Sequence, residues 1–416
     1  MSVDAERDAG PRTRTASLCF APCPRGLEEA LVEELRELGI APAHATAGGV
    51  HFTGTWPDAM RINLHSRIAS RVLVRVVQGR YRTEDDIHKL ALAQDWTRWF
   101  SVGQTLRVDT TAGSGKNKSG LKSLEFVTLR VKDGICDRFR DAVGERPSVD
   151  TRMPDVRVFA YLDANTCTLY LDTSGEPLFK RGWREESGDA PLRENLAAGI
   201  LRLAGWKPGV ALLDPMCGSG SFIVEAAQTA LHIAPGSMRS FGFEKLKNFD
   251  SASWEQMRSD SVVQPSDEDL AAVALLQASD VSGDAVGITR ANLERADVPS
   301  ALAAAIAPKQ IDARQVKPNA DHGIVIANPP YGERIAIRGE RSERGRQPDD
   351  DELTAFFGEF GNTLKQRFAG WTCHILTSDM NLQKKLRLSP DRRVVLFNGA
   401  IECRLYRFAV VSGQHR

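Results

Sequence analysis

The sequence has 416 residues, enough for two or three domains, and its 42% hydrophobic and 26% charged residues are ordinary for globular proteins. No apolar run approaches the about 18 residues of a membrane span, and residues 1–14 lack the apolar segment of a signal peptide. We therefore expect a cytoplasmic protein without membrane contact. Lys plus Arg and Asp plus Glu both total 54, so the zero net charge excludes a global field that attracts a polyanion, and any nucleic acid must bind a local basic surface.

The cysteines do not form a metal-binding or disulfide pattern. Seven are scattered along the chain, without a C-x2-C pair or an even number that could all be paired. We expect reduced thiols, no metal, and a small buried side chain at Cys217, because a nucleophilic cysteine would need an acid-base partner that the sequence does not indicate.

An α+β region is predicted over residues 16–178, after a disordered tail at residues 1–15. Short apolar strands alternate there with amphipathic helices, and a region of small mixed elements is typical of this class. The predicted strands are 16–21, 49–52, 71–77, 106–111, 157–162 and 166–171, and the predicted helices are 27–38, 57–64, 84–93 and 121–143.

Two basic segments are candidates for RNA contact. The first is the glycine-containing stretch 113–122, and the second is a basic, aromatic linker at 179–190. A solvated charged face is the alternative interpretation of the first. The RNA-binding residues predicted from these segments are Lys116, Lys118, Lys122, Lys180, Arg181 and Arg184.

A second domain is predicted at 191–416, where strands and helices alternate. This pattern indicates a doubly wound α/β sheet, and Asn398-Gly399 between two late strands indicates an antiparallel hairpin at its end. Charged insertions interrupt the pattern at 238–269 and 334–351. The predicted strands are 210–213, 274–278, 310–311, 323–327, 372–377, 393–397 and 403–411, and the predicted helices are 191–203, 221–232, 284–295 and 352–368.

Polar residues follow four of these strands: Asp214, Asp280, Asp312 and Asn328. Ligands of open parallel sheets bind beyond the carboxyl ends of the strands, so the four indicate one site, although each aspartate alone would suit a helix cap or turn.

A glycine turn follows the first strand. Gly218-Ser219-Gly220 lets the backbone turn before a helix whose free N–H groups favour a carboxylate, although a lone Gly-x-Gly is common in turns. This order of features matches the layout of S-adenosylmethionine-dependent methyltransferases that act on planar amino groups. Asp214 then suits the ammonium of the methionine tail, Asp280 two ribose hydroxyls, and Asp312 the adenine amino group. The predicted cofactor-binding residues are Asp214, Pro215, Gly218, Ser219, Gly220, Asp280, Asp312 and Asn328.

The tetrapeptide Asn328-Pro329-Pro330-Tyr331 supplies the predicted catalytic residues. Asn328 Oδ1 and the Pro329 carbonyl can each accept one N–H of an exocyclic amine, and Tyr331 can stack on the ring that carries it. These contacts would localise electron density on the nitrogen and orient it, without a strong general base.

Five segments together resemble the THUMP-domain-containing RNA guanine-N2 methyltransferases, especially those of large-subunit ribosomal RNA. They are residues 24–28, 180–184, 190–198, 213–220 and 328–334, so the similarity spans nearly the whole chain. The resemblance implies a ferredoxin-like and THUMP region that binds structured RNA, followed by a Rossmann-like methyltransferase sheet with S-adenosylmethionine as cofactor. Trp183 stands where tyrosine is usual in this family, and Ser221 where threonine is common.

Other interpretations use the same motifs. The acceptor could be a transfer RNA guanine, an adenine N6 in DNA or RNA, or a protein glutamine, because Asn-Pro-Pro-Tyr serves all of these. A non-catalytic RNA-binding or assembly protein is a further alternative, against which Asp214, Gly218, Gly220 and Asn328 all argue. Some family members carry a second methyltransferase, and we expect a single activity here.

Overall fold

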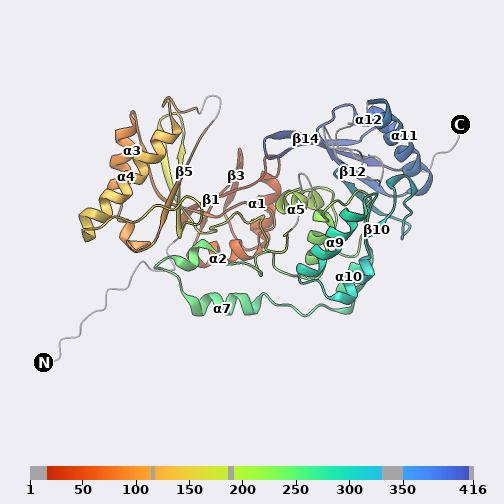
Figure 1. The fold of residues 1–416 in the computed structure, drawn as a ribbon, viewed down its shortest axis with the longest axis horizontal. Coiled ribbons are helices and arrows are strands. Elements are labelled where there is room, and N and C mark those ends of the chain that lie inside the picture. Colours follow the sequence, from red (N-terminus) through yellow and green to blue (C-terminus); the bar gives the residue numbers. More distant parts are fainter. Residues whose placement is uncertain (1–15, 114–117, 186–191, 330–349, 412–416) are drawn as a thin grey trace. The chain divides into compact units, whose positions relative to one another are not determined.

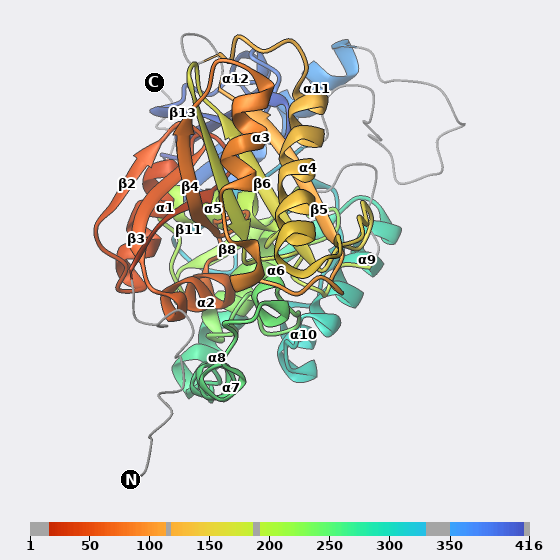
Figure 2. The same cartoon turned by 90° about the vertical axis from the view of Figure 1, so that its left-hand side faces the viewer.

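The computed structural model describes residues 16–113, 118–185, 192–329 and 350–411, and its chain forms two compact units, each with its own sheet (Figures 1 and 2). The first unit comprises Met1–Pro22, Val32–Leu178 and Arg239–Arg258, and the second comprises Cys23–Leu31, Phe179–Met238 and Ser259–Arg416. Helix α1, Glu28–Glu37, therefore contributes residues to both units.

The first unit contains a mostly antiparallel sheet of seven strands in the order β2-β3-β1-β4-β7-β6-β5, in which only β5 and β6 pair in parallel. Helices α3 and α4 lie side by side along this sheet (Figure 2). The strands are β1 Ser17–Pro22, β2 Ala43–Thr46, β3 Gly49–Gly54, β4 Leu73–Arg80, β5 Leu106–Ala112, β6 Val156–Leu162 and β7 Thr166–Asp172. The other elements are α2 Trp56–His65, α3 Glu84–Leu92, η1 Trp96–Arg98, α4 Leu124–Val143, η3 Gly242–Lys245 and α7 Ser251–Asp260, the last of which ends beyond the unit's boundary.

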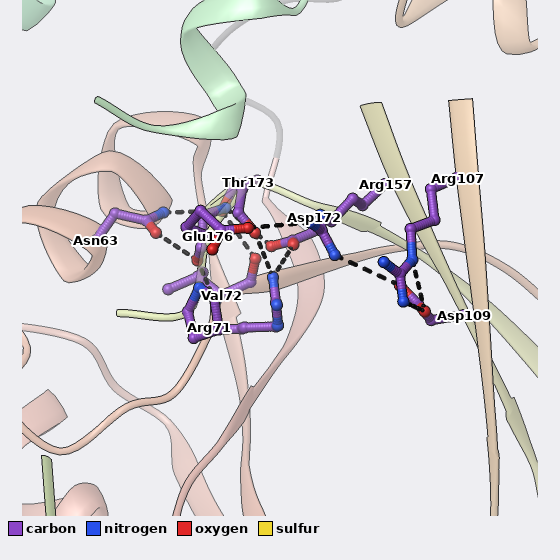
Figure 3. A network of polar contacts seen from close by, with 12 residues as sticks. Asn63, Arg71, Val72, Arg107, Asp109, Arg157, Asp172, Thr173 and Glu176 are labelled. Carbon is purple, nitrogen blue, oxygen red and sulfur yellow. Dashed lines mark hydrogen bonds and ion pairs between the residues drawn. The ribbon is translucent and has the colours of Figure 1, made fainter. Parts of the chain in front are cut away.

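Three arginines in or next to strands of this sheet have acidic partners within the same unit (Figure 3). Arg71 forms an ion pair with the buried Asp172, and Arg157 Nη2 lies 3.0 Å from Glu176 Oε1. Arg107 Nη2 lies 2.7 Å from Asp109 Oδ1. These three arginines therefore take part in ion pairs of the folded unit.

The insertion predicted at 238–269 supplies residues 239–258 to the first unit. The Phe243 N–H donates to the Thr173 carbonyl at 2.9 Å, and the Lys247 N–H donates to the Trp99 carbonyl at 2.9 Å. The ring of Trp254 meets that of Phe243 edge to face at 4.9 Å, so the insertion has a small aromatic core.

The second unit has a seven-stranded sheet in the order β10-β9-β8-β11-β12-β14-β13. The first five of these strands are parallel, and β14 pairs in antiparallel fashion with both β12 and β13, which confirms the predicted doubly wound sheet with an end hairpin. The strands are β8 Ala211–Asp214, β9 Leu276–Asp280, β10 Lys309–Gln310, β11 Gly323–Ala327, β12 Thr372–Thr377, β13 Arg392–Asn398 and β14 Ile401–Ala409. The other elements are α5 Glu194–Leu203, α6 Ser221–Ala230, α8 Asp267–Ala274, α9 Gly283–Arg295, α10 Ser300–Ile306, η4 Ala313–Gln315, α11 Asp350–Arg367 and α12 Leu382–Leu386.

The core of the second unit forms where α11 and α12 cover one face of this sheet. Buried side chains of β8, β11, β12 and β14 pack there against aromatic residues, including Phe360, Phe368 and Trp371. Burial of this apolar surface stabilises the sheet and so fixes the strand ends on which the polar residues lie.

Candidate active site

Three of the predicted polar residues lie at the carboxyl edge of the second unit's sheet. Asp214 is the last residue of β8 and Asp280 the last of β9, and Asn328 directly follows β11 on the other side of β8. The Gly218 N–H donates to Asp280 Oδ2 at 3.0 Å, so the loop after β8 reaches the end of β9. From β8 the chain continues to β9 and β10 on one side, and from β11 it continues to β12 on the other, so the order of the strands reverses between β8 and β11. Open α/β sheets bind ligands at such a switch point.

The glycine loop is held by helix α9. Thr289 Oγ1 donates to the Gly218 carbonyl at 2.8 Å, and Asn292 Nδ2 donates to the Ser219 carbonyl at 2.9 Å. Thr289 and Asn292 are three residues apart and so lie on one face of the helix. With its carbonyls bound to α9, the loop has a defined conformation.

The two glycines of this loop have different roles. Gly220 has a φ of +81°, and a Cβ there would lie 2.7 Å from Thr289 Cγ2, so glycine allows the close approach of α9. Gly218 has a φ of +53°, but an added Cβ would meet no described residue within 4 Å. There is therefore open space beside Gly218, three residues before α6, where the methionine tail of the cofactor is predicted to bind.

Asp214 is buried at the centre of this edge. Burial raises the pKa of its carboxyl well above the ordinary value, the Met216 N–H acts in the opposite direction, and the charge of Asp280 raises it further. No Lys, Arg or His in the described part of the chain forms an ion pair with Asp214. An ammonium group placed beside it would favour the ionised carboxylate, as the predicted contact with the methionine tail requires.

Asp312, predicted to bind the adenine amino group, lies two residues beyond β10. It accepts from the Arg314 N–H at 2.8 Å, and its Oδ2 accepts from Arg314 Nη2 at 2.6 Å. Burial acts to raise the pKa of Asp312, but the bonds and charge of Arg314 outweigh it and lower the pKa. Arg314 also bonds to Glu359 of α11 at 2.7 Å, so α11 helps to orient Asp312.

Asn328 has an unused acceptor. Its Oδ1 is buried and has no hydrogen-bond partner among the residues that the structure describes. Such an atom is costly unless it is paired, so a ligand N–H at this position would be stabilised. Pro329 is buried beside it, whereas Pro330 and Tyr331 lie outside the described residues.

Two of the predicted RNA-binding residues have other partners, and we correct these predictions. Arg181 is only 2% exposed, and its Nε lies 3.1 Å from Oε1 of the buried Glu225 on α6. Arg184 is mostly buried and bonds to Glu194, Ser219 and Ser221. Each guanidinium is thus engaged inside the second unit, where it cannot also bind a phosphate chain on the surface.

The other predicted RNA-binding residues are lysines. Lys118, Lys122 and Lys180 are exposed, and Lys116 lies outside the described residues. Their role in RNA binding stays a prediction.

Sequence reasoning missed the roles of Thr289, Asn292 and Glu194. Thr289 and Asn292 act on the glycine loop more than 70 residues away in sequence, and their only signal is their three-residue spacing. Glu194 lies within the family-like segment 190–198, but its contact with Arg184 was not predicted. Within the described ranges, no group of three or more His, Cys, Asp or Glu residues could hold a metal ion, and no helix is long and apolar enough to span a membrane.

Comparison with known proteins agrees with this geometry. Residues 181–407 match the model of the RMKL-like methyltransferase domain, residues 81–172 the THUMP domain, and residues 19–73 the RlmL ferredoxin-like domain. The chain belongs to the THUMP-containing, RlmL-like methyltransferase family. The predicted fold is confirmed: a ferredoxin-like and THUMP region is followed by a Rossmann-like methyltransferase sheet. S-adenosylmethionine is confirmed as the cofactor of the family.

Relatives in this family cover most of the chain. Ribosomal RNA large subunit methyltransferase K/L of Methylococcus capsulatus is 36% identical over 94% of this chain and 51% of its own length. The protein of the same name from Psychromonas ingrahamii is 38% identical over 94% and 50%. The chain thus spans about half the length of these curated relatives.

Solved structures share the fold over nearly the whole chain. The crystal structure of SMU.472 complexed with SAH has a TM-score of 0.79 and 27% identity, and covers 97% of this chain and 100% of that one. A predicted N6-adenine-specific DNA methylase from Listeria monocytogenes has a TM-score of 0.80 and 25% identity, with coverage of 95% and 97%.

Proposed function

We propose that this family member transfers a methyl group from S-adenosylmethionine to the exocyclic N2 amine of a guanine in structured RNA. The substrate we propose is large-subunit ribosomal RNA, in the cytoplasm. The single observation that carries the proposal is the buried Oδ1 of Asn328, which has no hydrogen-bond partner among the described residues and lies at the same sheet edge as Asp214 and Asp280. An acceptor in this position suits an amine that must lie beside the cofactor.

The cofactor supplies an electrophilic methyl group when it is bound. Asp214 would hold its ammonium group, and the N–H groups at the start of α6 would bind its carboxylate. Asp280 already accepts N–H bonds from Gly218 at 3.0 Å and Ser282 at 2.9 Å, one on each oxygen. Each carboxylate oxygen keeps a lone pair, so Asp280 can still accept from two ribose hydroxyls.

The acceptor amine would be positioned by Asn328 and Pro329. The lone pair of an exocyclic amine is delocalised into the ring, and two hydrogen bonds, to Asn328 Oδ1 and the Pro329 carbonyl, localise density on the nitrogen. They also stabilise the positive charge that develops during transfer. Stacking on Tyr331 is part of the proposal, and the proton can leave after transfer without a strong general base.

The RNA substrate is supported by the region before the methyltransferase domain. The THUMP and RlmL ferredoxin-like matches cover residues 81–172 and 19–73, and both curated relatives are named for large-subunit ribosomal RNA. An accessory region that holds structured RNA would offset the few kcal/mol needed to flip a base out of its stack.

Adenine N6 is the second candidate acceptor, because the Listeria monocytogenes structure is described as a predicted N6-adenine-specific DNA methylase. Mass spectrometry of ribonucleosides from a deletion strain distinguishes the candidates. We expect loss of N2-methylguanosine from large-subunit RNA. Loss of N6-methyladenosine, or loss of N2-methylguanosine from transfer RNA alone, would contradict the proposed substrate.

Asn328→Ala tests the proposed site. We expect the rate of methyl transfer to fall by about 10² to 10³-fold, because one positioned hydrogen bond to the reacting group is lost. Binding of S-adenosylhomocysteine and of RNA should persist, as calorimetry and filter binding would measure. Asn319→Ala, at an exposed asparagine of the same unit, is the control. Unchanged activity of Asn328→Ala would eliminate the proposed role of this residue.

A further inference from the structure

The side chain of Arg184 connects the segment before α5 to the glycine loop. Its Nη1 donates to Ser219 Oγ at 2.6 Å, and its Nη2 donates to Ser221 Oγ at 2.8 Å. The Nε donates to Glu194 Oε1 at 2.7 Å, and Nη2 also contacts the Leu192 carbonyl at 3.3 Å. Every nitrogen of the guanidinium therefore has a partner in the second unit.

Both serines lie where the cofactor's methionine tail is proposed to bind. Ser219 stands between Gly218 and Gly220, and Ser221 is the first residue of α6. Ser221 Oγ donates its proton to the Leu192 carbonyl at 2.9 Å, so its lone pairs are directed toward Arg184. The guanidinium thus fixes two side chains of the loop, whereas Thr289 and Asn292 fix its backbone carbonyls from α9.

Glu194 makes burial of this guanidinium tolerable. Its side chain is 5% exposed and that of Arg184 is 13% exposed, so both charges are largely removed from water. A charge-assisted bond between the two offsets part of the desolvation cost, and the planar fork of arginine allows it to bridge a carboxylate and two hydroxyls at once. A lysine has three N–H donors on a single nitrogen, so it cannot reach partners that lie around a planar fork as the three guanidinium nitrogens do.

We infer that Arg184 is a positioning residue that holds the loop from Gly218 to Ser221 in the conformation that binds the methionine end of the cofactor. The inference rests on the proposed cofactor contacts of this loop, and not on the identity of the methylated base. Arg184 acts through Ser219 and Ser221, and Glu194 orients it.

Binding of two ligands tests this role. S-adenosylhomocysteine carries the amino-acid end, and 5′-methylthioadenosine lacks it. We expect Arg184→Met to weaken binding of S-adenosylhomocysteine about tenfold or more, as the loss of a supporting contact does, and to leave 5′-methylthioadenosine binding unchanged. Arg184→Lys should fall between Met and wild type, because it keeps only part of the contacts. Arg407→Met, which removes a half-buried arginine paired with Asp391 at 3.1 Å, is the matched control.

Loop mobility gives an independent readout on the full chain without ligand. Amide hydrogen exchange at residues 218–222 should be faster in Arg184→Met than in wild type or Arg407→Met, with the rest of the second unit unchanged. With RNA substrate, KM for S-adenosylmethionine should rise while kcat at saturation stays near that of wild type.

Three outcomes would overturn the inference: equal weakening of both ligands, unchanged binding of S-adenosylhomocysteine, or unchanged exchange in the loop. Each leaves the guanine assignment intact, because that assignment is decided by the modified nucleoside and by Asn328. Conversely, an adenine product would refute the proposed acceptor without affecting the role of Arg184.

Discussion

Burial shifts the pKa of two residues in the second unit in opposite directions. Asp214 is a buried acid whose pKa is raised by burial, and His374 in β12 is a buried base whose pKa is lowered to about 4, first by burial and then by the charge of Arg407. His374 Nε2 has no hydrogen-bond partner in the described part of the structure. Asp214 lies at the carboxyl edge of the sheet, where the positive charge of a bound ligand can stabilise its carboxylate. His374 lies in the middle of β12 and is neutral near pH 7.

His374 predicts a loss of stability in acid. The unfolded chain binds a proton near the ordinary pKa of 6.5, but the folded protein does so only near 4, so protonation favours the unfolded state as the pH falls through this window. Between pH 7 and pH 5 this residue should lower the free energy of unfolding by about 2 kcal/mol. Urea unfolding of wild type and His374→Leu at both pH values measures it. Equal pH dependence of the two proteins would contradict the prediction.

At the scale of elements, helices α11 and α12 of the second unit pack with their backbones in close contact. A Cβ on Gly361 of α11 would lie 2.1 Å from the Leu386 carbonyl oxygen of α12. That atom is backbone and cannot rotate away, so glycine is required where these two helices meet. Helix propensity alone would disfavour glycine in α11. Packing against α12 therefore overrides the local preference.

Gly361→Ala should lower the free energy of unfolding by roughly 1 to 3 kcal/mol, because the two helices must move apart. Gly287→Ala in α9 is the matched control: an added Cβ there meets nothing within 4 Å, so it should raise stability by about 0.5 to 1 kcal/mol through helix propensity. Chemical denaturation compares the two. A stable Gly361→Ala variant would show that α12 can shift at little cost.

At the scale of the whole molecule, the net charge is zero, so RNA must be attracted by a local basic surface. Arg181 is buried in the second unit and is not available at the surface, and Arg71, Arg107 and Arg157 are paired with acidic residues of the first unit (Figure 3). The exposed lysines of segment 118–122 remain as candidates.

Charge reversal of Lys118 and Lys122 together should weaken RNA binding and reduce its dependence on salt, because fewer counterions are released per complex. Filter binding over a series of salt concentrations measures both quantities. Lys207→Glu combined with Lys317→Glu, at two exposed lysines of the second unit, changes the net charge by the same amount and is the control. If the double variant had the wild-type affinity and slope, segment 118–122 would not be part of the RNA-binding surface.

The sequence by itself determined six of the seven strands in the first unit, all seven strands in the second, and the residues at the second sheet's strand ends; β2, Ala43–Thr46, was not predicted. Strands, glycine turns and the Asn-Pro-Pro-Tyr segment are local features, and parallel order then requires Asp214, Asp280 and Asn328 to share an edge. The ends of the elements were predicted less well: the predicted strand 274–278 begins and ends two residues before β9, which spans Leu276–Asp280.

Only the tertiary structure decided which partner each arginine has and which unit each inserted segment joins. Arg181 and Arg184 look alike in a basic linker, but their partners Glu225 and Ser219 are 44 and 35 residues away in sequence. Residues 23–31 likewise belong to the second unit and residues 239–258 to the first, although the segments on either side of each in sequence belong to the other unit. Long side chains and insertions find their contacts only once the chain has folded, because burial and pairing energies depend on what lies nearby in space.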